Sequence, residues 1–481
     1  MKMLKPLFLL LSIGLTACSS VPNDTEQLVS LSTSYMYEDE RYVTRLGEGD
    51  SWWQSFDDPI LNELVARAQQ QNITLKVASE NIIMAQSYQA AVSSLKVPTI
   101  ALGAGYNHIG LSENEAFAGP IVGTSVMGQS LVDSSAGNYL VGASVAWEMD
   151  LFGRIDAMTM AASVRAEQAG LARDGLTIVI TGEVISNYFE MRSAQQRRVI
   201  VQKSVEQQKE VLIRVERLLK SGMASQLEVA RSQAMLAQTE ALIPQLETAE
   251  TIHKQRLAIL LSDQSEAFFA MLSDSNELPT FSGLIPVGLP SEILKNRPDV
   301  RAAELEVSAQ NYELGAALAS QYPSFYLSGT PGLVAKNFDD LFSSDSIAWT
   351  AGVGVKWNLF DGGRTQSLIE LNEARLNSAV LNYQHSVNTA ISEVEMLLKA
   401  YGDNHQYHRS MREAQQYGVQ AFERAQALYS AGLIDQIELL DAQRQLLYLD
   451  ERELLARSQS AQLVVQLHKA LGGDWRDQVE T

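Results

Sequence analysis

The sequence contains two copies of one unit, and this repeat restricts the possible folds more than any other feature. Adding 210 to a residue number in the first copy gives the same residue type in the second copy at a series of positions: Trp147 and Trp357, Gly153 and Gly363, Arg165 and Arg375, Glu183 and Glu393, Arg214 and Arg424, Gly222 and Gly432, Gln226 and Gln436, Glu228 and Glu438, and Gln233 and Gln443. The offset is constant along the copies, so neither has an insertion relative to the other. This constant length indicates one mechanical spacing that is built twice.

Each copy contains a long stretch with the composition of one continuous helix. It is free of proline, poor in glycine and rich in Ala, Leu, Gln, Glu and Arg. The stretch from Arg154 to Ser221 would extend about 100 Å at a rise of about 1.5 Å per residue. Seam positions recur in it at alternate spacings of four and three residues, which is typical of contacts between neighbouring helices: Val201, Val205, Gln208, Leu212, Val215 and Leu219. Long helical hairpins or a plain coiled coil would both satisfy this pattern.

The N-terminus and the net charge restrict the location and the partners. The formal net charge is −20, which argues against nucleic acid as a partner because phosphates would be repelled. Lys2 and Lys5, followed by a short apolar run, predict a secretory leader that is too short to span a bilayer. Cys18 is the single cysteine, and the sequence Leu15-Thr16-Ala17-Cys18 resembles the bacterial lipobox. We therefore expect the chain to be cut before Cys18, which would then be acylated and would anchor the chain to a membrane. Ser19, rather than Asp, after the cysteine resembles the signal for sorting to the outer membrane.

Alternation with a period of two predicts two pairs of β-strands, one before each long helix. The strands are expected near residues 100–106, 139–150, 324–328 and 349–359, with long polar loops at 108–137 and 332–347. One face is apolar and the other carries small or polar residues, as in a strand between lipid and a lumen. Trp349 and Trp357 share the apolar face, about 26 Å apart at 3.3 Å per residue, near the height of a membrane's apolar band. Four strands cannot close a barrel, and an open edge is costly in lipid, so the barrel must be shared between chains.

Shorter helices are expected before each strand pair. Asp58 is placed to cap a helix that starts at Pro59. The expected short helices cover residues 59–71, 74–95 and 298–319. The expected domains are a lipoprotein signal peptide (1–17), an N-terminal segment with the first helices (18–97), a first β-hairpin (98–150), a first long helical hairpin (151–261), an equatorial linker (262–322), a second β-hairpin (323–361), and a second long helical hairpin with the C-terminus (362–481).

The two return helices are expected to differ. Pro244 lies inside the return helix of the first copy, where it removes a backbone hydrogen bond. Its counterpart in the second copy is Leu454. We therefore predict a bend in the first return helix that the second lacks.

Several motifs together resemble one family. They are Trp52-Trp53 with Phe56-Asp57-Asp58-Pro59, the run Gly288-Leu-Pro-Ser to Asn296-Arg-Pro-Asp299, and the paired Trp and Gly-Arg motifs of the repeat. With the leader, they are similar to the outer-membrane efflux proteins of the TolC and OprM type, in their lipoprotein branch. The resemblance covers essentially the whole mature chain. It implies a mainly α fold with a small β part, in which a homotrimer shares a twelve-stranded barrel that continues into an α-barrel of long helical hairpins.

The same resemblance implies partners and a function. It implies a passive exit duct of a tripartite efflux pump of the RND type, which a periplasmic adaptor (a membrane fusion protein) and an inner-membrane transporter complete. In this family the last helix pair closes the inner end of the tube. By resemblance, Glu438 and Asp441 correspond to the inward acidic positions of a periplasmic gate, and Tyr429 to a residue of the closing network. Some members have arginine where this chain has Ile434, so apolar packing would replace a salt-bridged lock here.

The turns of the helical hairpins are candidate contact surfaces. Gly222 and Gly432 each stand between two helices and are by default helix C-caps. In the family such tips dock the adaptor, which by resemblance assigns adaptor docking to Gly222, Met223, Gly432 and Leu433.

The sequence has no catalytic constellation, so we expect no enzyme activity and no cofactor. His405 and His408 are spaced to share a helix face, but one pair is too few ligands for a metal site. Two other functions stay open. One is the outer channel of a protein-exporting (type I) secretion system, and the other is a periplasmic coiled-coil lipoprotein without a pore.

Overall fold

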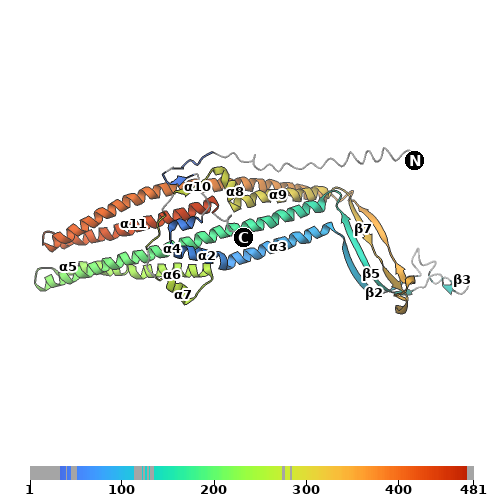
Figure 1. Ribbon diagram of the computed structural model, residues 1–481, viewed down its shortest axis with the longest axis horizontal. Helices are drawn as coiled ribbons and strands as arrows, with labels where there is room; N and C mark the ends of the chain where they lie inside the picture. The colour runs from blue at the N-terminus through green and yellow to red at the C-terminus, as the bar shows by residue number, and fades with distance from the viewer. Residues whose placement is uncertain are drawn as a thin grey trace. The chain divides into compact units, whose positions relative to one another are not determined.

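The computed structural model describes residues 33–39, 41–44, 51–112, 122, 125–126, 129–130, 135–273, 277–281 and 284–473. The expected leader and Cys18 lie outside these residues. Helices predominate and accompany one six-stranded sheet (Figure 1), so the expected mainly α fold with a small β part is confirmed. Within these ranges, every helix falls short of the combination of length and hydropathy that a membrane span requires.

The described residues separate into two compact units. The first comprises Ile83–Glu167 and Leu305–Val380 and contains the six-stranded sheet. The second comprises the described parts of Asp24–Ile82, Gln168–Glu304 and Leu381–Thr481, and contains most of the helical hairpins.

The long helices follow the spacing of the repeat. Helix α4 (Arg154–Lys220) and helix α10 (Arg364–Ser430) each have 67 residues, and they begin and end 210 residues apart. The return helix of the first copy consists of α5 (Gln226–Glu240) and α6 (Leu242–Leu261), whereas that of the second is the single helix α11 (Gln436–Leu471). The equal lengths of α4 and α10 place the two hairpin turns at equivalent positions.

The seam predicted along α4 is a packing surface. Val201, Val205 and Val215 are at most 3% exposed. Val201 and Val205 pack against Leu246 of α6, whereas Val215 belongs to a cluster that includes Leu439 of α11. One seam therefore contacts both its own return helix and the other hairpin, and this apolar burial stabilises the helices far more than their intrinsic propensity does.

The two return helices differ, as expected, because the first is interrupted close to Pro244 and the second is continuous. The bend expected at Pro244 stays a prediction. Ala241 forms a turn between α5 and α6. Pro244 has no N–H to donate to the carbonyl of Glu240, four residues earlier, so the helix loses a hydrogen bond at this point. The leucine at the matching position of α11 permits an unbroken helix there.

The sheet has the width of four strands. Its elements are β2 (Thr99–Gly110), β5 (Ser135–Met149), β7 (Ser324–Gly329), β8 (Gly332–Ala335), β9 (Ile347–Ala348) and β10 (Ala351–Lys356). All pairs are antiparallel, and β7 and β8 lie in line along β5 in one register. In the same way, β10 and β9 lie in line along β7 and β8. The edges of the sheet are thus β2 on one side and β9 with β10 on the other.

Two expectations about the second strand pair are wrong in detail. The strand expected over 349–359 ends at Lys356 and is broken at Trp349 and Thr350, and the loop expected over 332–347 contains β8 and β9. Pro331 explains the break between β7 and β8, which lie next to this strand, because proline has no N–H to donate to the ladder. Its carbonyl still accepts from Ala143 N–H (2.9 Å), which keeps β8 aligned with β5.

The two repeated tryptophans make the same contact in both copies. Trp147 Nε1 donates to the carbonyl of Lys96 (3.1 Å), and Trp357 Nε1 donates to that of Gln321 (2.9 Å). Each carbonyl lies three residues before the first strand of its pair. Each indole therefore ties the last strand of a pair to the chain that enters the pair.

Short elements connect these parts. They are the 3-10 helices η3 (Trp52–Phe56), η4 (Ser94–Lys96), η5 (Pro290–Glu292), η6 (Phe338–Asp340) and η7 (Ser344–Ser346), the helices α2 (Pro59–Gln71), α3 (Ile73–Ser93), α7 (Glu266–Met271), α8 (Ile293–Asn296) and α9 (Pro298–Ala319), and the strand pairs β1 (Val43–Thr44) with β6 (Ile285–Pro286) and β3 (Ser125–Val126) with β4 (Gln129–Ser130). The expected helices at 59–71 and 298–319 are confirmed, and the one at 74–95 is shared between α3 and η4. Asp58 caps α2 by accepting from Ile60 N–H (2.9 Å) and Leu61 N–H (3.1 Å).

Candidate functional site

The two hairpin turns have the same backbone geometry. Gly222 and Gly432 adopt φ values of +76° and +74°, which glycine reaches without steric cost. In each turn the glycine N–H donates to the carbonyl three residues earlier (2.9 and 3.0 Å). The next residue, Met223 or Leu433, donates to the carbonyl five residues earlier (2.8 and 2.9 Å). This pair of bonds is the Schellman motif, and it ends both long helices in the same way.

Both turns present an apolar side chain to solvent. Met223 is 70% exposed and Leu433 is 71% exposed, at matching positions of the repeat. The Schellman bonds use only the backbone of these residues, so most of each residue faces solvent. The structure thus places the four residues predicted for adaptor docking together in pairs, two in each turn.

The helices that follow the turns are capped differently. Ser225 and Glu228 form a capping box before α5, in which Ser225 N–H donates to Glu228 Oε2 (2.6 Å). This bond lowers the pKa of Glu228. In the second copy Asp435 takes over the cap and accepts from Ile437 N–H (2.8 Å) and Glu438 N–H (3.1 Å). The carboxylate of Glu438 is therefore not required for capping, and it is exposed and makes no hydrogen bond to the described residues.

The three predicted gate residues lie close in sequence but have different surroundings. Glu438 and Asp441 are exposed on the first turns of α11, and Asp441 pairs with Arg444. Tyr429 is half-buried and packs against the cluster that contains Val215 and Leu439. Burial raises the pKa of its hydroxyl. Tyr429 makes no hydrogen bond to either carboxylate within the described part of the chain, so a single chain does not join the three residues into one network.

Two polar contacts between the hairpins were not identified from the sequence. Gln436 is buried, and its Nε2 donates to the carbonyl of Glu228 (3.1 Å) and to Ser232 Oγ. Arg214 Nη1 donates to Ser430 Oγ (2.9 Å). Gln436 stood out only as an identity of the repeat, and the repeat alone does not distinguish a contact residue from an exposed residue that happens to be the same in both copies.

The linker motif at 296–299 joins three elements through one side chain. Arg297 is 11% exposed. Its Nη1 donates to Glu393 Oε2 of α10 (2.7 Å) and to the carbonyl of Ala470 in the last turn of α11 (2.8 Å), while Nε and Nη2 bond both oxygens of Asp299 (3.0 and 2.8 Å). The planar guanidinium can serve all these acceptors at once. The sequence indicated a helix start at Pro298 but gave no sign of this junction.

The tryptophan motif near the start of the described chain forms an aromatic core. Trp52, Trp53 and Phe56 are at most 7% exposed. Trp52 stacks on His468 of α11 with ring centroids 4.4 Å apart and planes 4° apart. Complete burial lowers the pKa of His468 from its usual 6.5 to about 3, so the stacked ring is neutral. The motif thus fixes the N-terminal segment to the end of the second return helix.

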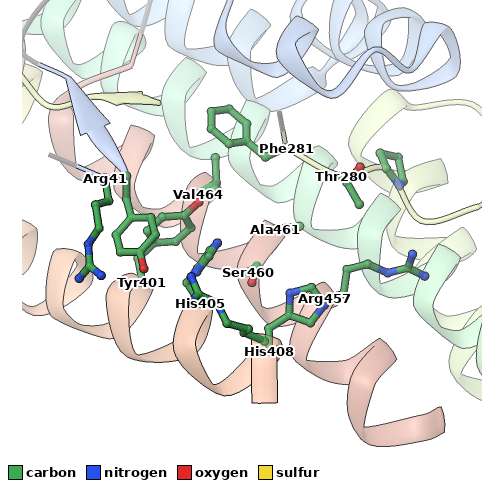
Figure 2. Close-up of a pocket in the computed structure, with 13 residues that line it drawn as sticks. Arg41, Thr280, Phe281, Tyr401, His405, His408, Arg457, Ser460, Ala461 and Val464 are labelled. Carbon is green, nitrogen blue, oxygen red and sulfur yellow. The ribbon is translucent and has the colours of Figure 1, made fainter. Parts of the chain in front are cut away.

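A pocket of about 460 Å³ lies beside α10 and α11 (Figure 2). His405 stacks obliquely on Tyr42, with centroids 4.5 Å apart, and His408 Nε2 bonds Glu453 Oε1 (3.0 Å). Burial lowers the pKa of His405, and the nearby positive charge of Arg409 lowers it further. No three His, Cys, Asp or Glu side chains of the described residues are placed to hold a metal ion.

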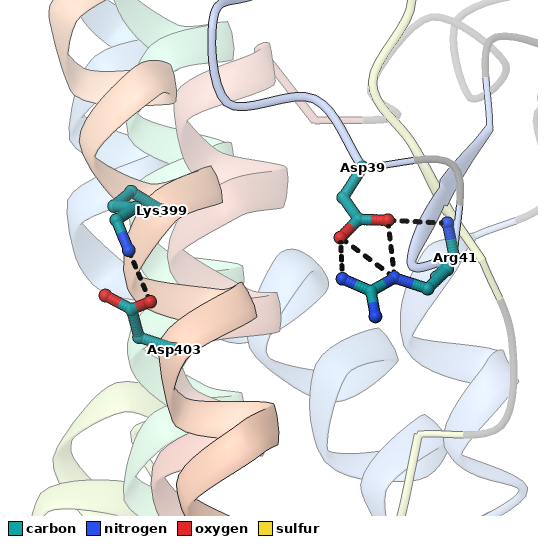
Figure 3. Close-up of polar contacts among 4 residues, drawn as sticks. All are labelled: Asp39, Arg41, Lys399 and Asp403. Carbon is teal, nitrogen blue, oxygen red and sulfur yellow. Dashed lines mark hydrogen bonds and ion pairs between the residues drawn. The ribbon is translucent and has the colours of Figure 1, made fainter.

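Two ion pairs lie near this pocket and are exposed; Figure 3 shows both. The Arg41 guanidinium chelates Asp39, with Nε 3.0 Å from Oδ1, and these bonds lower the pKa of Asp39 to about 2. Lys399 pairs with Asp403 one turn along α10. Exposed pairs of this kind contribute little to stability. The rim of the pocket is therefore a solvated surface, and the helix tips remain the stronger candidate site.

Comparison with known proteins defines the class. The chain belongs to the outer membrane efflux protein family, whose sequence profile matches residues 64–262 and 289–473. It is 28% identical to the solvent efflux pump outer membrane protein SrpC of Pseudomonas putida over 98% of both chains. It is 27% identical to the outer membrane protein OprJ of Pseudomonas aeruginosa over 98% of this chain and 97% of OprJ.

Solved structures agree with this assignment. The outer-membrane channel OprN superposes with a TM-score of 0.85 at 28% identity, over 92% of this chain and 97% of OprN. The CmeC outer membrane channel of Campylobacter jejuni shares the fold, with a TM-score of 0.80 at 21% identity over 95% of this chain and 93% of CmeC. The chain is thus an outer membrane efflux protein with the fold of known outer-membrane channels.

Proposed function

We propose that three copies of this chain form the outer-membrane exit duct of a tripartite, RND-type efflux pump. Each copy would contribute four strands to a shared twelve-stranded barrel and two helical hairpins to a periplasmic tube. Acylation of Cys18 would add a lipid anchor. A periplasmic adaptor and an inner-membrane transporter would complete the pump, and the duct would pass small molecules passively, as the solvent and toluene efflux relatives suggest.

The observation that carries this proposal is the open sheet with exposed apolar side chains at both edges. Ile100 and Leu102 of β2 are 67% and 87% exposed, and Val353 and Val355 of β10 are 69% and 61% exposed. In lipid, unpaired strand edges are costly, whereas apolar side chains are favourable. Joining β2 of one chain to β10 of the next would satisfy both edges in a closed ring.

Planar bilayers test the duct directly. We expect the purified trimer to conduct, and the double variant Glu438→Gln/Asp441→Asn to lose much of its preference for cations, because carboxylates near a narrow pore concentrate cations. The measurement is the reversal potential in a salt gradient. Asp435→Asn is the control for the loss of a single charge nearby, because the Asp435 carboxylate caps α11; each single variant, Glu438→Gln and Asp441→Asn, is compared with it.

Two outcomes would count against this proposal. If folded trimers of both the wild type and the double variant fail to conduct, a scaffold without a pore is favoured. Conductance with unchanged selectivity in the double variant would leave the duct intact but remove Glu438 and Asp441 from its gate.

The tips would dock the adaptor through their exposed apolar side chains. We expect Met223→Asp/Leu433→Asp to abolish drug export in cells while conductance in bilayers stays at the wild-type level. The exchange Met223→Leu/Leu433→Met keeps the apolar surface and should retain export. Export that survives the aspartates, measured as resistance to toxic compounds in a strain without the native channel, would rule out tip docking.

A further inference from the structure

The two helical hairpins make a similar internal contact at nearly equivalent positions. In the first hairpin, Gln195 Nε2 donates to Glu250 Oε1 (2.9 Å). In the second, Asn404 Nδ2 donates to Ser460 Oγ (2.7 Å). Ser460 is the counterpart of Glu250, and Asn404 is the neighbour of the residue that matches Gln195. The offset of the repeat therefore relates this contact in the two hairpins to within one residue.

Within the chain, α4 of the first hairpin contacts α11 of the second, and all the residues concerned lie in the second unit. Three contacts mark this interface: the Lys469 side chain covers Gly182, Gln462 Nε2 donates to the carbonyl of Ser186 (3.0 Å), and Arg457 Nη2 donates to Gln196 Oε1 (2.7 Å). The interface is close, because a Cβ added at Gly182 would come within 2.5 Å of Lys469 Cδ.

The repeat maps each of these residues onto a position in the other hairpin. On the α4 side, Gly182, Ser186 and Gln196 correspond to Ser392, Met396 and Gln406 of α10; on the α11 side, Lys469, Gln462 and Arg457 correspond to Ile259, Ile252 and Glu247 of α6. All six mapped positions are exposed in the single chain. Three of them carry large apolar side chains, which are exposed by 66% at Met396, 46% at Ile252 and 67% at Ile259.

Within the chain, the surface of α4 in the first hairpin contacts the surface of α11 in the second. The equivalent surfaces, on α10 of the second hairpin and α6 of the first, do not contact each other within the described part of the chain. The matching residues on α10 and α6 are exposed, one set on each hairpin, and Gln406 also lines a pocket with Tyr37 and Arg41. A second copy can cover each set, and a head-to-tail contact that is repeated in this way forms a ring when its rotation closes.

We infer that Ile252 of one subunit packs against Met396 of the next, with Ile259 beside Ser392 and Glu247 accepting a hydrogen bond from Gln406. This inference deepens the proposed function, because it rests on assembly from several copies and assigns the residues that meet. The chemistry at the mapped positions is complementary. Ile252 and Met396 would remove exposed apolar surface from water. The Gln406 amide would donate to the Glu247 carboxylate, which reverses the direction of the bond within the chain, where Arg457 donates to Gln196.

Paired cysteines test the assignment in the full-length protein. Cys18 is the only native cysteine, so Ile252→Cys/Met396→Cys adds the only thiols of the helical hairpins. We expect dibromobimane, a short thiol cross-linker, to join these thiols between subunits and to give a denatured species with the mass of three chains. The matched control is Ser186→Cys/Gln462→Cys, which occupies the same contact within one chain and should keep the mass of a single chain.

Single-cysteine variants show the background from Cys18, and native mass spectrometry shows assembly independently. One outcome contradicts only the residue assignment: trimers form and the control pair cross-links, but denatured Ile252→Cys/Met396→Cys keeps the mass of a single chain. The proposed exit duct would then be unaffected. If the control pair cross-links while native mass spectrometry finds only single chains, the proposed assembly fails and the inference fails with it. Cross-links between subunits in both pairs would show that the interfaces do not follow the repeat.

Discussion

Replacing Arg297 with alanine is expected to lower the unfolding free energy by roughly 3 kcal/mol per chain, because four charged hydrogen bonds are lost and the buried carbonyl of Ala470 is left without a donor. The effect should appear as a lower midpoint of the far-UV circular dichroism signal in detergent, on heating or in denaturant. Because Arg297 connects the linker with α10 and α11, both long helices of the second copy should be affected together.

Two further variants provide reference values for the loss of unfolding free energy. Arg297→Lys keeps the charge but cannot reach all the acceptors, so an intermediate loss is expected. Arg165→Ala removes an exposed arginine that pairs with Glu313 (2.8 Å), and such pairs contribute only about 0–1 kcal/mol. Equal stability of Arg297→Ala and Arg165→Ala would show that the junction is not a major source of stability.

Acidification is expected to destabilise the chain through His468. Its pKa is about 3 in the folded protein and 6.5 when unperturbed, so between these values the unfolded chain binds a proton that the folded chain excludes. Stability is therefore fully present above pH 6.5 and falls as the pH falls toward 3. At pH 5 the loss is about 2 kcal/mol per chain, at 1.36 kcal/mol per pH unit.

His468→Phe isolates this contribution because phenylalanine keeps an aromatic ring against Trp52 and does not titrate. We expect the difference in thermal midpoint between pH 7.5 and pH 5 to be larger in the wild type than in His468→Phe. Carboxylates whose pKa is raised by burial, such as Glu190 and Asp450, act in the opposite sense in both proteins and cancel in the comparison. Equal pH dependence of the two proteins would contradict a buried neutral His468.

Local patterns predicted the elements that depend on local chemistry. The repeat, the absence of proline and the seam spacing predicted α4 and α10, and Pro244 predicted that the two return helices differ, because each of these effects acts within one or two helical turns. The strand pairs were predicted by alternation, but their ends were not. Pro331 breaks one strand, and only the register of its partner shows that pairing continues beyond it.

Contacts between distant segments could not be predicted in the same way. Arg297 bonds Glu393 and Ala470, and Trp52 stacks on His468, across separations that no periodicity encodes. The exposed tips could be predicted from the sequence, because a glycine between two long helices indicates a turn that ends one helix and starts the next. The gate positions Glu438 and Asp441 came from the family resemblance, since a carboxylate on a helix of an acidic chain is ordinarily a solvated residue.

We expect the turn at Ala241 to make the first hairpin of each subunit torsionally softer than the second. An unbroken helix carries a twist along its whole length, whereas a helix with a missing hydrogen bond yields at that point. A twist applied at the tips would be transmitted by α11 and absorbed between α5 and α6. Faster amide exchange around Ala241 than around Glu451, its counterpart in α11, would show this difference, and equal exchange would refute it. In a ring built from such subunits, stiff and compliant hairpins would alternate. A rotation applied at the tips would then be transmitted by every second hairpin.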